Sequence, residues 1–410
     1  MLPLVQFAWF RKSLLLFGSM LLLCTVLSAQ ENLKLAFWDQ QRKGANGDGG
    51  ALHNSGTSPD KWFSAAARAG IAYVRLSVDG WQGESKDYLI GDADDFENLV
   101  PEDLAYLIDV LDIAERHKVK IVLCMFQLPG ARWRQLNNMK RDFRIWTENK
   151  FQEQAILFWE QLAKKLKDHP AVVGYNLLNE PHPSWKDHPS ASSRSGFEKW
   201  LQEIEGTTAD LNQFYEKAVD RIRKIDPHTP IMLDGWQYAS IEGFPYLKPV
   251  QDDAILYAFH FYGKWRYATF RVNKGKFSYP DKMPIGEENE TETWEANRIA
   301  KEMAPIFEWA THYQVPLNRI VAAEFGVDRR VGGAALFLKD TIKSLNNKKL
   351  HWAFYSFRSA TWDGLDYELG TAKLGWNYWK QRESGKLHED LIKRGDNPLW
   401  DIFKAELKGK

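Results

Sequence analysis

Beyond residue 30, short apolar runs alternate with longer segments whose apolar residues are three or four positions apart. The runs are rich in Val, Ile and Leu and cover residues 71–77, 119–125, 171–178, 230–235, 254–260, 319–324 and 350–356. None of them alternates apolar with polar positions, which is typical of strands covered on both faces, as in a parallel sheet. An eighth and weaker run, near Leu33 to Asn46, is needed to close a barrel.

The segments between the runs carry helical spacing. Leu104, Leu107, Ile108 and Leu111 follow it after Pro101, which favours the first turn of a helix. The same spacing recurs at Phe151, Ala155, Phe158 and Leu162, at Phe214, Ala218, Ile222 and Ile225, and at Ile299, Met303 and Ile306. This alternation predicts an α/β fold with a parallel sheet.

A closed barrel is favoured over an open sheet. No Gly-x-Gly-x-x-Gly follows an early strand, which disfavours a nucleotide-binding open sheet. We therefore predict one (β/α)8 TIM barrel over residues 30–410, with its surplus residues in two loop regions, 182–207 and 261–293.

The N-terminal residues 1–29 have the order of a secretory signal peptide. Arg11 and Lys12 precede an apolar stretch from Leu14 to Leu27, and the small residues Ser28 and Ala29 follow. Cleavage after Ala29 predicts a secreted or periplasmic protein with no stable membrane association. An uncleaved anchor is the alternative, because Leu27 is a poor residue three positions before the cut.

The composition and the net charge indicate which classes of molecule the protein binds. The 54 Lys and Arg residues balance the 54 Asp and Glu residues, so the net charge does not favour nucleic acid as a partner. We also expect the protein to be a monomer. The 18 Trp exceed ordinary core needs, and Trp rings offer flat surfaces on which sugars stack. Candidates for stacking, with core packing as the alternative for each, are Trp81, Trp133, Trp185, Trp236, Trp265 and Trp362.

Polar side chains stand where the apolar runs end. Asn179-Glu180 follows one run, Glu324 ends another, and Arg75, His260 and Tyr262 lie at further strand ends. The segments are "YVRLS", "NLLNEP", "AFHFYG" and "AAEFGV". In such barrels the active site lies at the carboxyl ends of the strands. Two carboxylates across one cleft are the machinery of glycoside hydrolysis, one protonated and one ionised. The alternative to a catalytic role for Asn179 and Glu180 is a local turn at residues 179–181. The alternative for the other residues is a structural role.

These roles require different surroundings for the two glutamates. We expect burial and the second carboxylate to raise the pKa of Glu180, and Arg75 to lower the pKa of Glu324. The amide of Asn179 could position a sugar hydroxyl. Residues 356–370 add three carboxylates, for which a solvated loop is favoured over a metal site, since the pattern of a calcium loop is missing. We expect no metal and no cofactor.

These motifs resemble glycoside hydrolase family 5, the cellulase-type (β/α)8 hydrolases of clan A, from about residue 40 to residue 380. The resemblance implies that Glu180 is the proton donor and that Asn179 is its hydrogen-bonding neighbour. It also implies that Glu324 is the nucleophile of a retaining double displacement. Arg75, His260 and Tyr262 then bind substrate in the same site.

Two strand segments depart from the family's pattern. Cys124 and Phe126 stand in the third strand segment where the family commonly has Asp and His, and Tyr355 stands for the Trp of the eighth strand. The resemblance implies a retaining β-glycosidase acting on glucan- or mannan-type saccharides, and the leader sequence predicts that it is secreted. A glycolipid hydrolase or transglycosylase on the same site is one alternative, and a carbohydrate-binding barrel with little catalysis is another.

Overall fold

The structure of the chain is a computed structural model that describes residues 33–47, 57–81, 83, 85–185, 193–285, 290–359 and 363–408. The predicted signal peptide lies outside the described residues, and the domain limits 30–410 stay a prediction. In the ranges that are described, no helix is both long and apolar enough to cross a membrane.

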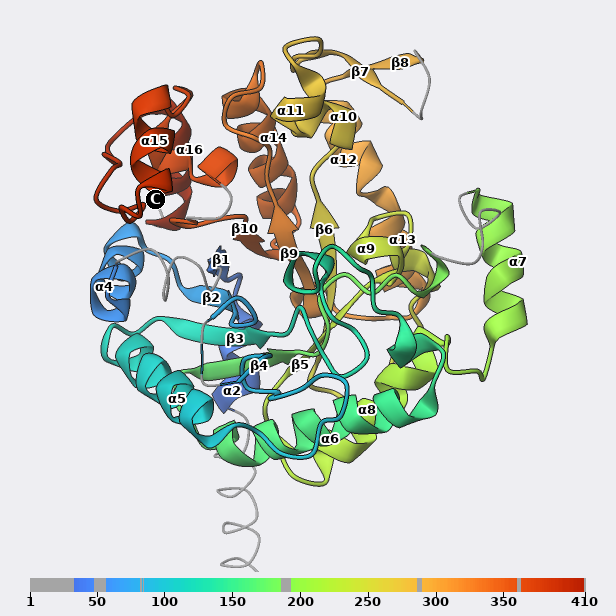
Figure 1. Cartoon of the computed structure of the whole chain (residues 1–410). Helices are drawn as coiled ribbons and strands as arrows, with labels where there is room; N and C mark the ends of the chain where they lie inside the picture. Colours follow the sequence, from blue (N-terminus) through green and yellow to red (C-terminus); the bar gives the residue numbers. More distant parts are fainter. Residues whose placement is uncertain are drawn as a thin grey trace, which may run out of the picture.

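Eight parallel strands form a closed barrel, which confirms the predicted (β/α)8 fold (Figure 1). In chain order they are β1 (Lys43–Gly47), β2 (Tyr73–Ser77), β3 (Lys120–Cys124), β4 (Val172–Asn176), β5 (Ile231–Asp234), β6 (Ile255–Phe261), β9 (Ile320–Phe325) and β10 (His351–Phe354). Each strand pairs with its neighbours in parallel, and β1 closes the barrel by pairing with both β2 and β10.

Helices surround the barrel and cover its outer face (Figure 1). They are α4 (Pro59–Ala69), α5 (Pro101–Arg116), α6 (Asn149–Leu166), α8 (Leu211–Arg223), α12 (Ala296–Glu302), α13 (Ala304–His312), α14 (Ala334–Asn347) and α16 (Pro398–Leu407). Helical spacing predicted α5, α6 and α8 correctly. The predicted helix through Ile299, Met303 and Ile306 is two helices, since Pro305 has no N–H and its ring obstructs a continuous helix.

The remaining elements lie mostly in the loops that join strands to helices. They are α2 (Leu33–Ala36), α7 (Arg194–Ile204), α9 (Trp236–Ala239), α10 (Trp265–Ala268), α11 (Phe270–Asn273), α15 (Trp376–Glu383), the antiparallel pair β7 (Asp281–Pro284) and β8 (Thr291–Trp294), and short 3-10 turns. The two predicted loop regions thus hold α7 and the α10-to-β8 segment.

The first strand covers only the last part of the predicted run from Leu33 to Asn46. Residues 33–39 form α2 and a 3-10 turn, and only Lys43–Gly47 joins the sheet. Trp38 explains the difference: its fully buried ring contacts Tyr73 and its Nε1 donates to the carbonyl of Val173 at 2.9 Å. The segment therefore does not need to join the sheet, because packing against the barrel interior already removes the Trp38 side chain from water.

The barrel interior consists of an apolar cluster with a polar layer beyond it. The apolar cluster is made of Trp38, Tyr73, Val122, Val173, Met232, Leu256, Ala258, Val321, Ala323 and Ala353. Two residues further along their strands, Arg75, Asp234 and His260 follow Tyr73, Met232 and Ala258 on the same face, as the period of a strand requires. The polar layer therefore lies toward the carboxyl ends of the strands.

Candidate active site

Arg75 organises the polar layer. Its Nη1 donates to Glu324 Oε1 at 2.6 Å and to Asn46 Oδ1 at 3.1 Å, and its Nε donates to Asn176 Oδ1 at 2.7 Å. Its Nη2 donates to Asn179 Oδ1 at 2.7 Å and to Asp234 Oδ2 at 3.3 Å. All five N–H groups of the guanidinium are thus satisfied, which a buried arginine needs.

Glu324 reaches this layer through an irregularity in β9. Val321 and Ala323 face the interior cluster, so strict alternation would turn Glu324 outward. The pairing with β6 shifts between Phe259 and His260, which places Glu324 opposite His260. A local bulge of this kind re-aims a side chain. The carboxylate is only 5% exposed and also accepts the Tyr262 hydroxyl at 2.6 Å.

Glu180 follows β4 and has a backbone φ of 49°, in the left-handed region that residues with a Cβ rarely adopt. Two hydrogen bonds hold the turn: Asn179 N–H donates to Met125 O at 2.8 Å, and Glu180 N–H donates to Asp234 Oδ2 at 3.1 Å. The Glu180 side chain is 20% exposed, more than that of Glu324. Strain at this position is therefore sustained by contacts from β3 and β5.

His260 links the two glutamates. Its Nδ1 lies 2.9 Å from Glu180 Oε1 and 3.6 Å from Glu324 Oε2, and its Nε2 lies 3.5 Å from Asp234 Oδ2. Burial lowers the pKa of His260, although Glu324 and Asp234 oppose that shift. A neutral imidazole has one N–H donor and one acceptor nitrogen, so His260 can donate a hydrogen bond to only one of these carboxyl groups at a time.

Burial raises the pKa of both glutamates. For Glu180 the value rises from 4.5 to about 8, with Asp234 adding to the rise and Arg75 opposing it. For Glu324 burial is again the largest cause, whereas His260, Arg75 and the Tyr262 hydroxyl act in the opposite direction. The expected rise in the pKa of Glu180 is found, but the carboxylate that adds to it is Asp234 and not Glu324. The expected net lowering at Glu324 is not, because desolvation outweighs the arginine.

The three side chains at the centre could also hold a metal ion. One ligand atom each from Glu180, His260 and Glu324 lies within 4.8 Å of the other two. Two carboxylates and an imidazole suit several divalent ions. The same spacing brings the two carboxyl groups close enough to act on one glycosidic bond.

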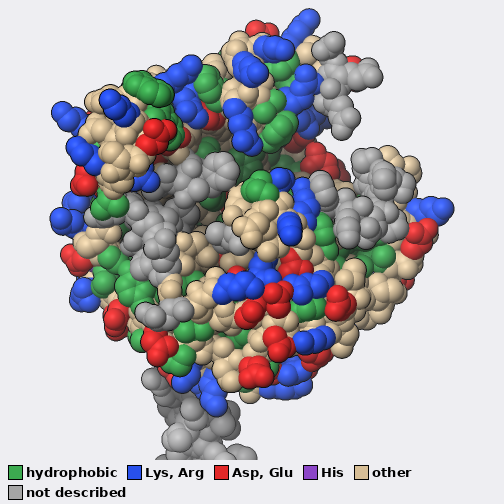
Figure 2. Space-filling view, viewed as in Figure 1, with side chains coloured by type: hydrophobic (Ala, Val, Ile, Leu, Met, Phe, Trp, Pro, Cys, Tyr) green, Lys and Arg blue, Asp and Glu red, His purple; other side chains and the backbone are tan. Residues whose placement is uncertain are grey.

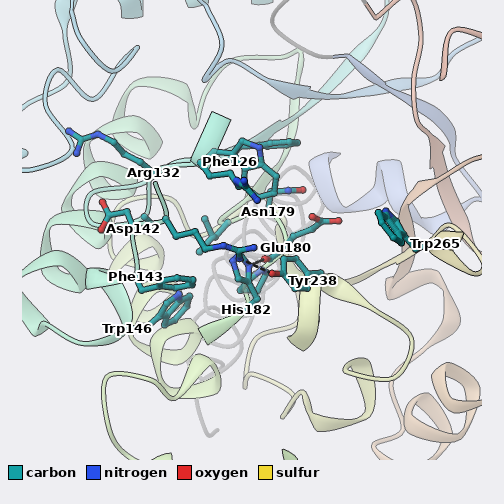
Figure 3. Close-up of a pocket in the computed structure, with 16 residues that line it drawn as sticks. Phe126, Arg132, Asp142, Phe143, Trp146, Asn179, Glu180, His182, Tyr238 and Trp265 are labelled. Carbon is teal, nitrogen blue, oxygen red and sulfur yellow. Dashed lines mark hydrogen bonds between the residues drawn. The ribbon is translucent and has the colours of Figure 1, made fainter. Parts of the chain in front are cut away.

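Two cavities meet at Glu180. The first has a volume of about 820 Å³ and extends past Trp133, Arg141, His182 and Tyr238, on the loops after β3, β4 and β5. Figure 3 shows Glu180 at its centre and Trp265 to one side. The second, of about 650 Å³, extends past Glu324, on the loops after β6, β9 and β10. Phe126, Trp133, Asn179, Glu180 and Trp265 border both. The glutamates thus lie in one continuous cleft.

Five of the seven predicted site residues border this cleft, namely Asn179, Glu180, Tyr262, Glu324 and Tyr355. Arg75 and His260 are buried next to it, where they contact Glu324 and Glu180. Tyr355 directly follows β10, is buried, and borders the second cavity with Glu324 and Tyr262. Asn179 accepts from Arg75 through Oδ1, so its amide N–H groups remain available as donors to a ligand. Cys124 is fully buried at the end of β3, whereas Phe126 forms part of the cleft wall.

The tryptophans predicted as candidates for sugar stacking fall into two groups, those that border the cleft and those that are buried in the core. Trp133 and Trp265 border both cavities, and Trp265 is 62% exposed. Trp81 and Trp236 are buried among other aromatic rings, so the core-packing alternative holds for them. Sequence spacing cannot separate the two outcomes, because burial depends on residues far along the chain. The Trp185 side chain and Trp362 lie outside the described residues.

The acidic residues near 356–370 are paired with arginines. Arg358 donates to both oxygens of Glu368, at 2.7 and 3.0 Å, and Arg394 donates to Asp366 at 2.9 Å. Asp363 lies 3.3 Å from Arg329. These pairs occupy the carboxylates that a metal site would need. The segment is not the solvated loop that the sequence predicted, because Phe357, Asp366 and Tyr367 are buried.

Three polar residues of the site escaped the sequence reasoning: Asn46, Asn176 and Asp234. Asp234 is fully buried and accepts from Arg75, from Asn176 Nδ2 at 2.9 Å and from the Glu180 backbone. Its signal is present in the sequence, since Asp234 is the only charged residue of the apolar run 230–235 and stands one position before its end, much as Glu324 ends another run. A buried acid at a strand end in such a barrel is a candidate site residue.

The family model described as "Cellulase (glycosyl hydrolase family 5)" matches residues 38–361. The chain belongs to this family. The predicted resemblance to this family of glycosyl hydrolases is therefore confirmed. The match contains every strand of the barrel and every predicted site residue.

Individual relatives are distant. The chain is 23% identical over 335 residues to a beta-xylosidase of Phanerodontia chrysosporium, covering 76% of this chain and 61% of that protein. It is 26% identical over 207 residues to Endoglucanase C of Acetivibrio thermocellus, covering half of each. The chain thus spans between half and about three fifths of the length of these curated relatives.

A solved structure shares the fold. A hyperthermophilic endo-beta-1,4-glucanase in complex with substrate matches with a TM-score of 0.61 and 18% identity, over 91% of this chain and 99% of that one. At this level of identity the likeness shows the (β/α)8 fold alone.

Proposed function

We propose that this protein is a retaining β-glycosidase that hydrolyses β-linked glucans by double displacement. Glu324 is the nucleophile, and Glu180 is the general acid and then the general base. The observation that carries the proposal is the spacing of the two carboxyl groups, whose nearest ligand atoms lie within 4.8 Å. Retaining enzymes hold them about 5–5.5 Å apart, and inverting enzymes hold them further apart to admit water.

The charges of the cluster favour the same assignment. One arginine, Arg75, faces three carboxyl groups, those of Asp234, Glu324 and Glu180, and His260 is held toward its neutral form. Three buried anions around one cation are unfavourable, so one of the three must hold a proton. Glu180 suits that role because it has no hydrogen bond from Arg75, whereas Glu324 has one at 2.6 Å.

The steps follow from this arrangement. Glu324 attacks the anomeric carbon while Glu180 gives its proton to the departing oxygen, which leaves as a neutral alcohol. The Tyr262 hydroxyl and Arg75 hold Glu324 in position for attack. Glu180, now ionised, takes a proton from water, and the resulting hydroxide equivalent displaces Glu324 from the sugar. Each glutamate ends in its initial protonation state.

The substrate class is proposed from the cleft and the relatives together. The cleft is open and bordered by the rings of Phe126, Trp133 and Trp265, which suit the flat faces of β-linked sugars. Relatives are named endoglucanase and beta-xylosidase. We propose β-glucan oligo- or polysaccharides first, with mannans and xylans as members of the test panel.

The deciding experiment follows the stereochemistry of the product. The protein is incubated with β-glucans, mannans, xylans and glycolipids, and the anomer first released from the best substrate is identified by proton NMR. Initial release of the β-anomer supports the proposal. Initial release of the α-anomer means inversion and overturns the assignment of Glu324. Absence of cleavage across the panel favours a binding protein.

Export is proposed separately, from the leader-like order of residues 11–29. N-terminal sequencing of the protein recovered outside the cytoplasm should give a start near Gln30. An intact Met1 in a membrane fraction would favour the uncleaved anchor.

A further inference from the structure

The segment that borders the first cavity is unusually basic. Residues 131–144, "ARWRQLNNMKRDFR", carry Arg132, Arg134, Lys140, Arg141 and Arg144 and a single acid, Asp142. The whole chain, by contrast, has equal numbers of basic and acidic residues. In the lower part of the face in Figure 2, Lys and Arg side chains lie beside Asp and Glu side chains. The excess of cations is therefore a local property of this segment.

Two of the five cations, Arg132 and Arg144, pair with carboxylates of the protein. Arg132 donates to Asp87 at 2.9 Å and to Asp92 and Asp94 at 2.7 Å. Arg144 donates to Asp142 Oδ2 at 2.7 Å and also pairs with Asp94. These contacts tie the segment to the loop after β2, and they account for Asp142, the one acid that the segment contributes to the cavity wall. Within the described residues, Arg134 and Lys140 form no ion pair of this kind.

Arg134 and Arg141 border the cavity itself. Arg141 Nη1 donates to the Tyr238 hydroxyl at 3.1 Å, and the Tyr238 ring stacks on His182 at a centroid distance of 4.1 Å. His182 in turn lies 2.7 Å from the carbonyl of Glu180. Within the described part of the chain, Arg134 is exposed and has no carboxylate partner. Two guanidinium groups thus stand on the wall of a cavity that begins at Glu180.

This cavity lies on the leaving-group side of the cleavage point. Glu180 borders both cavities, but Glu324, Tyr262 and Tyr355 border only the second. The nucleophile lies beneath the sugar that becomes bound to it, whereas the acid reaches the oxygen of the group that leaves. The sugar of the covalent intermediate therefore occupies the side of Glu324, and the group that departs occupies the first cavity.

We propose that the leaving-group side of this cleft binds a saccharide unit that carries a negative charge, a carboxylate or a sulfate ester, through Arg134 and Arg141. Guanidinium groups bind both anions through paired hydrogen bonds, and such charge-assisted bonds are stronger than neutral ones. The aromatic rings that border the same cavity supply contact for the sugar itself. This inference rests on the proposed glycosidase function and adds the class of substrate to it.

The test compares one β-glucan in three forms: neutral, partly oxidised to glucuronate at C6, and partly sulfated. Binding is measured with the full-length Glu324→Gln variant, so that the glucan is not cleaved during the measurement. The value of kcat/KM is measured with the wild type. We expect at least one anionic form to bind about tenfold more tightly than the neutral form, with a preference that weakens as salt is raised. The oxidised and sulfated arms distinguish the two anions.

Arg134→Gln in the Glu324→Gln background should weaken binding of the anionic glucan about tenfold. The affinity for the neutral glucan should stay the same. Arg134 is the decisive position because Arg141 also holds Tyr238. Lys140→Gln is the matched control, since it removes the same charge from the same segment without removing a residue that borders the cavity. Its effect should be much smaller.

Equal binding of the three glucans, or equal losses in Arg134→Gln and Lys140→Gln, would overturn the proposed anion site. Failure of the glycosidase proposal gives a different result: the wild type cleaves none of the glucans, while the binding arm still reports on the arginines. Cleavage of neutral glucan without any anion preference would leave the glycosidase in place and remove this inference alone.

Discussion

The two glutamates of the cleft occupy opposite kinds of surroundings only about 5 Å apart. Glu324 is 5% exposed and accepts from Arg75 and Tyr262, both at 2.6 Å. Glu180 is 20% exposed, meets His260 through its side chain, and has the buried Asp234 beneath its backbone N–H. One carboxyl group is surrounded by donors, which favour the anion. The other has a neutral ring and a second acid as neighbours, which favour the protonated form.

The comparison teaches that desolvation alone does not assign roles. Burial raises the pKa of both residues, so the difference lies in what opposes it. At Glu324 three groups oppose it, namely His260, Arg75 and Tyr262, whereas Arg75 alone opposes it at Glu180. Pairs of titratable groups whose surroundings separate their pKa values are the usual arrangement for an acid and a nucleophile.

The largest effect is expected at Glu324. Glu324→Ala removes the nucleophile and should lower kcat/KM by about 10⁴-fold or more on every glycoside that the wild type cleaves. No glycosyl-enzyme should be detected by mass spectrometry, and added azide should restore turnover only to the α-glycosyl azide. Glu383→Ala, on the exposed end of α15, should retain wild-type activity. A trapped intermediate in Glu324→Ala would reassign the nucleophile.

The next effect is expected at Glu180, and it should depend on the leaving group. Glu180→Ala should lower kcat/KM by about 10³-fold on saccharides, whose leaving oxygen needs a proton. Dinitrophenyl glycosides need none, so their first step should be spared and the glycosyl-enzyme should accumulate on Glu324. Azide should then restore turnover and give the β-glycosyl azide. Equal losses on both classes of substrate, with no effect of azide, would exclude Glu180 as the acid and base.

A smaller effect should come from Asp234, which shapes the surroundings of Glu180. The wild type should lose activity on saccharides as pH rises through about 8, because Glu180 then gives up the proton that it must donate. Asp234→Asn removes a negative charge that raises this pKa, so the alkaline limb of the kcat/KM profile should move to lower pH. We expect about a tenfold loss at neutral pH.

Asp226→Asn is the control for that shift. Asp226 is equally buried but bonds Tyr175 and the turn before β5, away from the glutamates. This variant should lower the free energy of unfolding and leave the pH profile where it is. An alkaline limb that stays fixed in Asp234→Asn would show that Asp234 does not act on Glu180.

The smallest expected effect is that of a chelator, which we predict to be none. The roles proposed for Glu180 and Glu324 need no metal, although these residues and His260 could ligate one. Activity after dialysis against EDTA should equal that of the untreated protein. Loss of activity that returns with one divalent ion would mean that the cluster is a metal site, and the contrast between the two glutamates would need a different explanation.

Much of the fold and the centre of the site could be predicted from the sequence. Seven of the eight strands lie within the predicted apolar runs or overlap them closely, and Glu180 and Glu324 stand at or just beyond the ends of two of them. This was possible because both features are local: a buried parallel strand must be apolar along its length, and a polar residue at its carboxyl end is visible in the letters. Arg75, His260 and Tyr262 were found by the same signal.

The tertiary structure alone decided what depends on contacts between distant segments. It turned Glu324 inward through a shift in the pairing of β9 with β6, brought Asp234 of β5 beneath Glu180, and buried Trp81 and Trp236 while leaving Trp265 exposed. It also moved the first strand to Lys43–Gly47, because Trp38 found its place against the barrel interior. The sequence by itself determined the alternation of strands and helices and the acids at their ends. Which side chains meet was decided by closure of the barrel, since closure sets register, desolvation and neighbouring charge together.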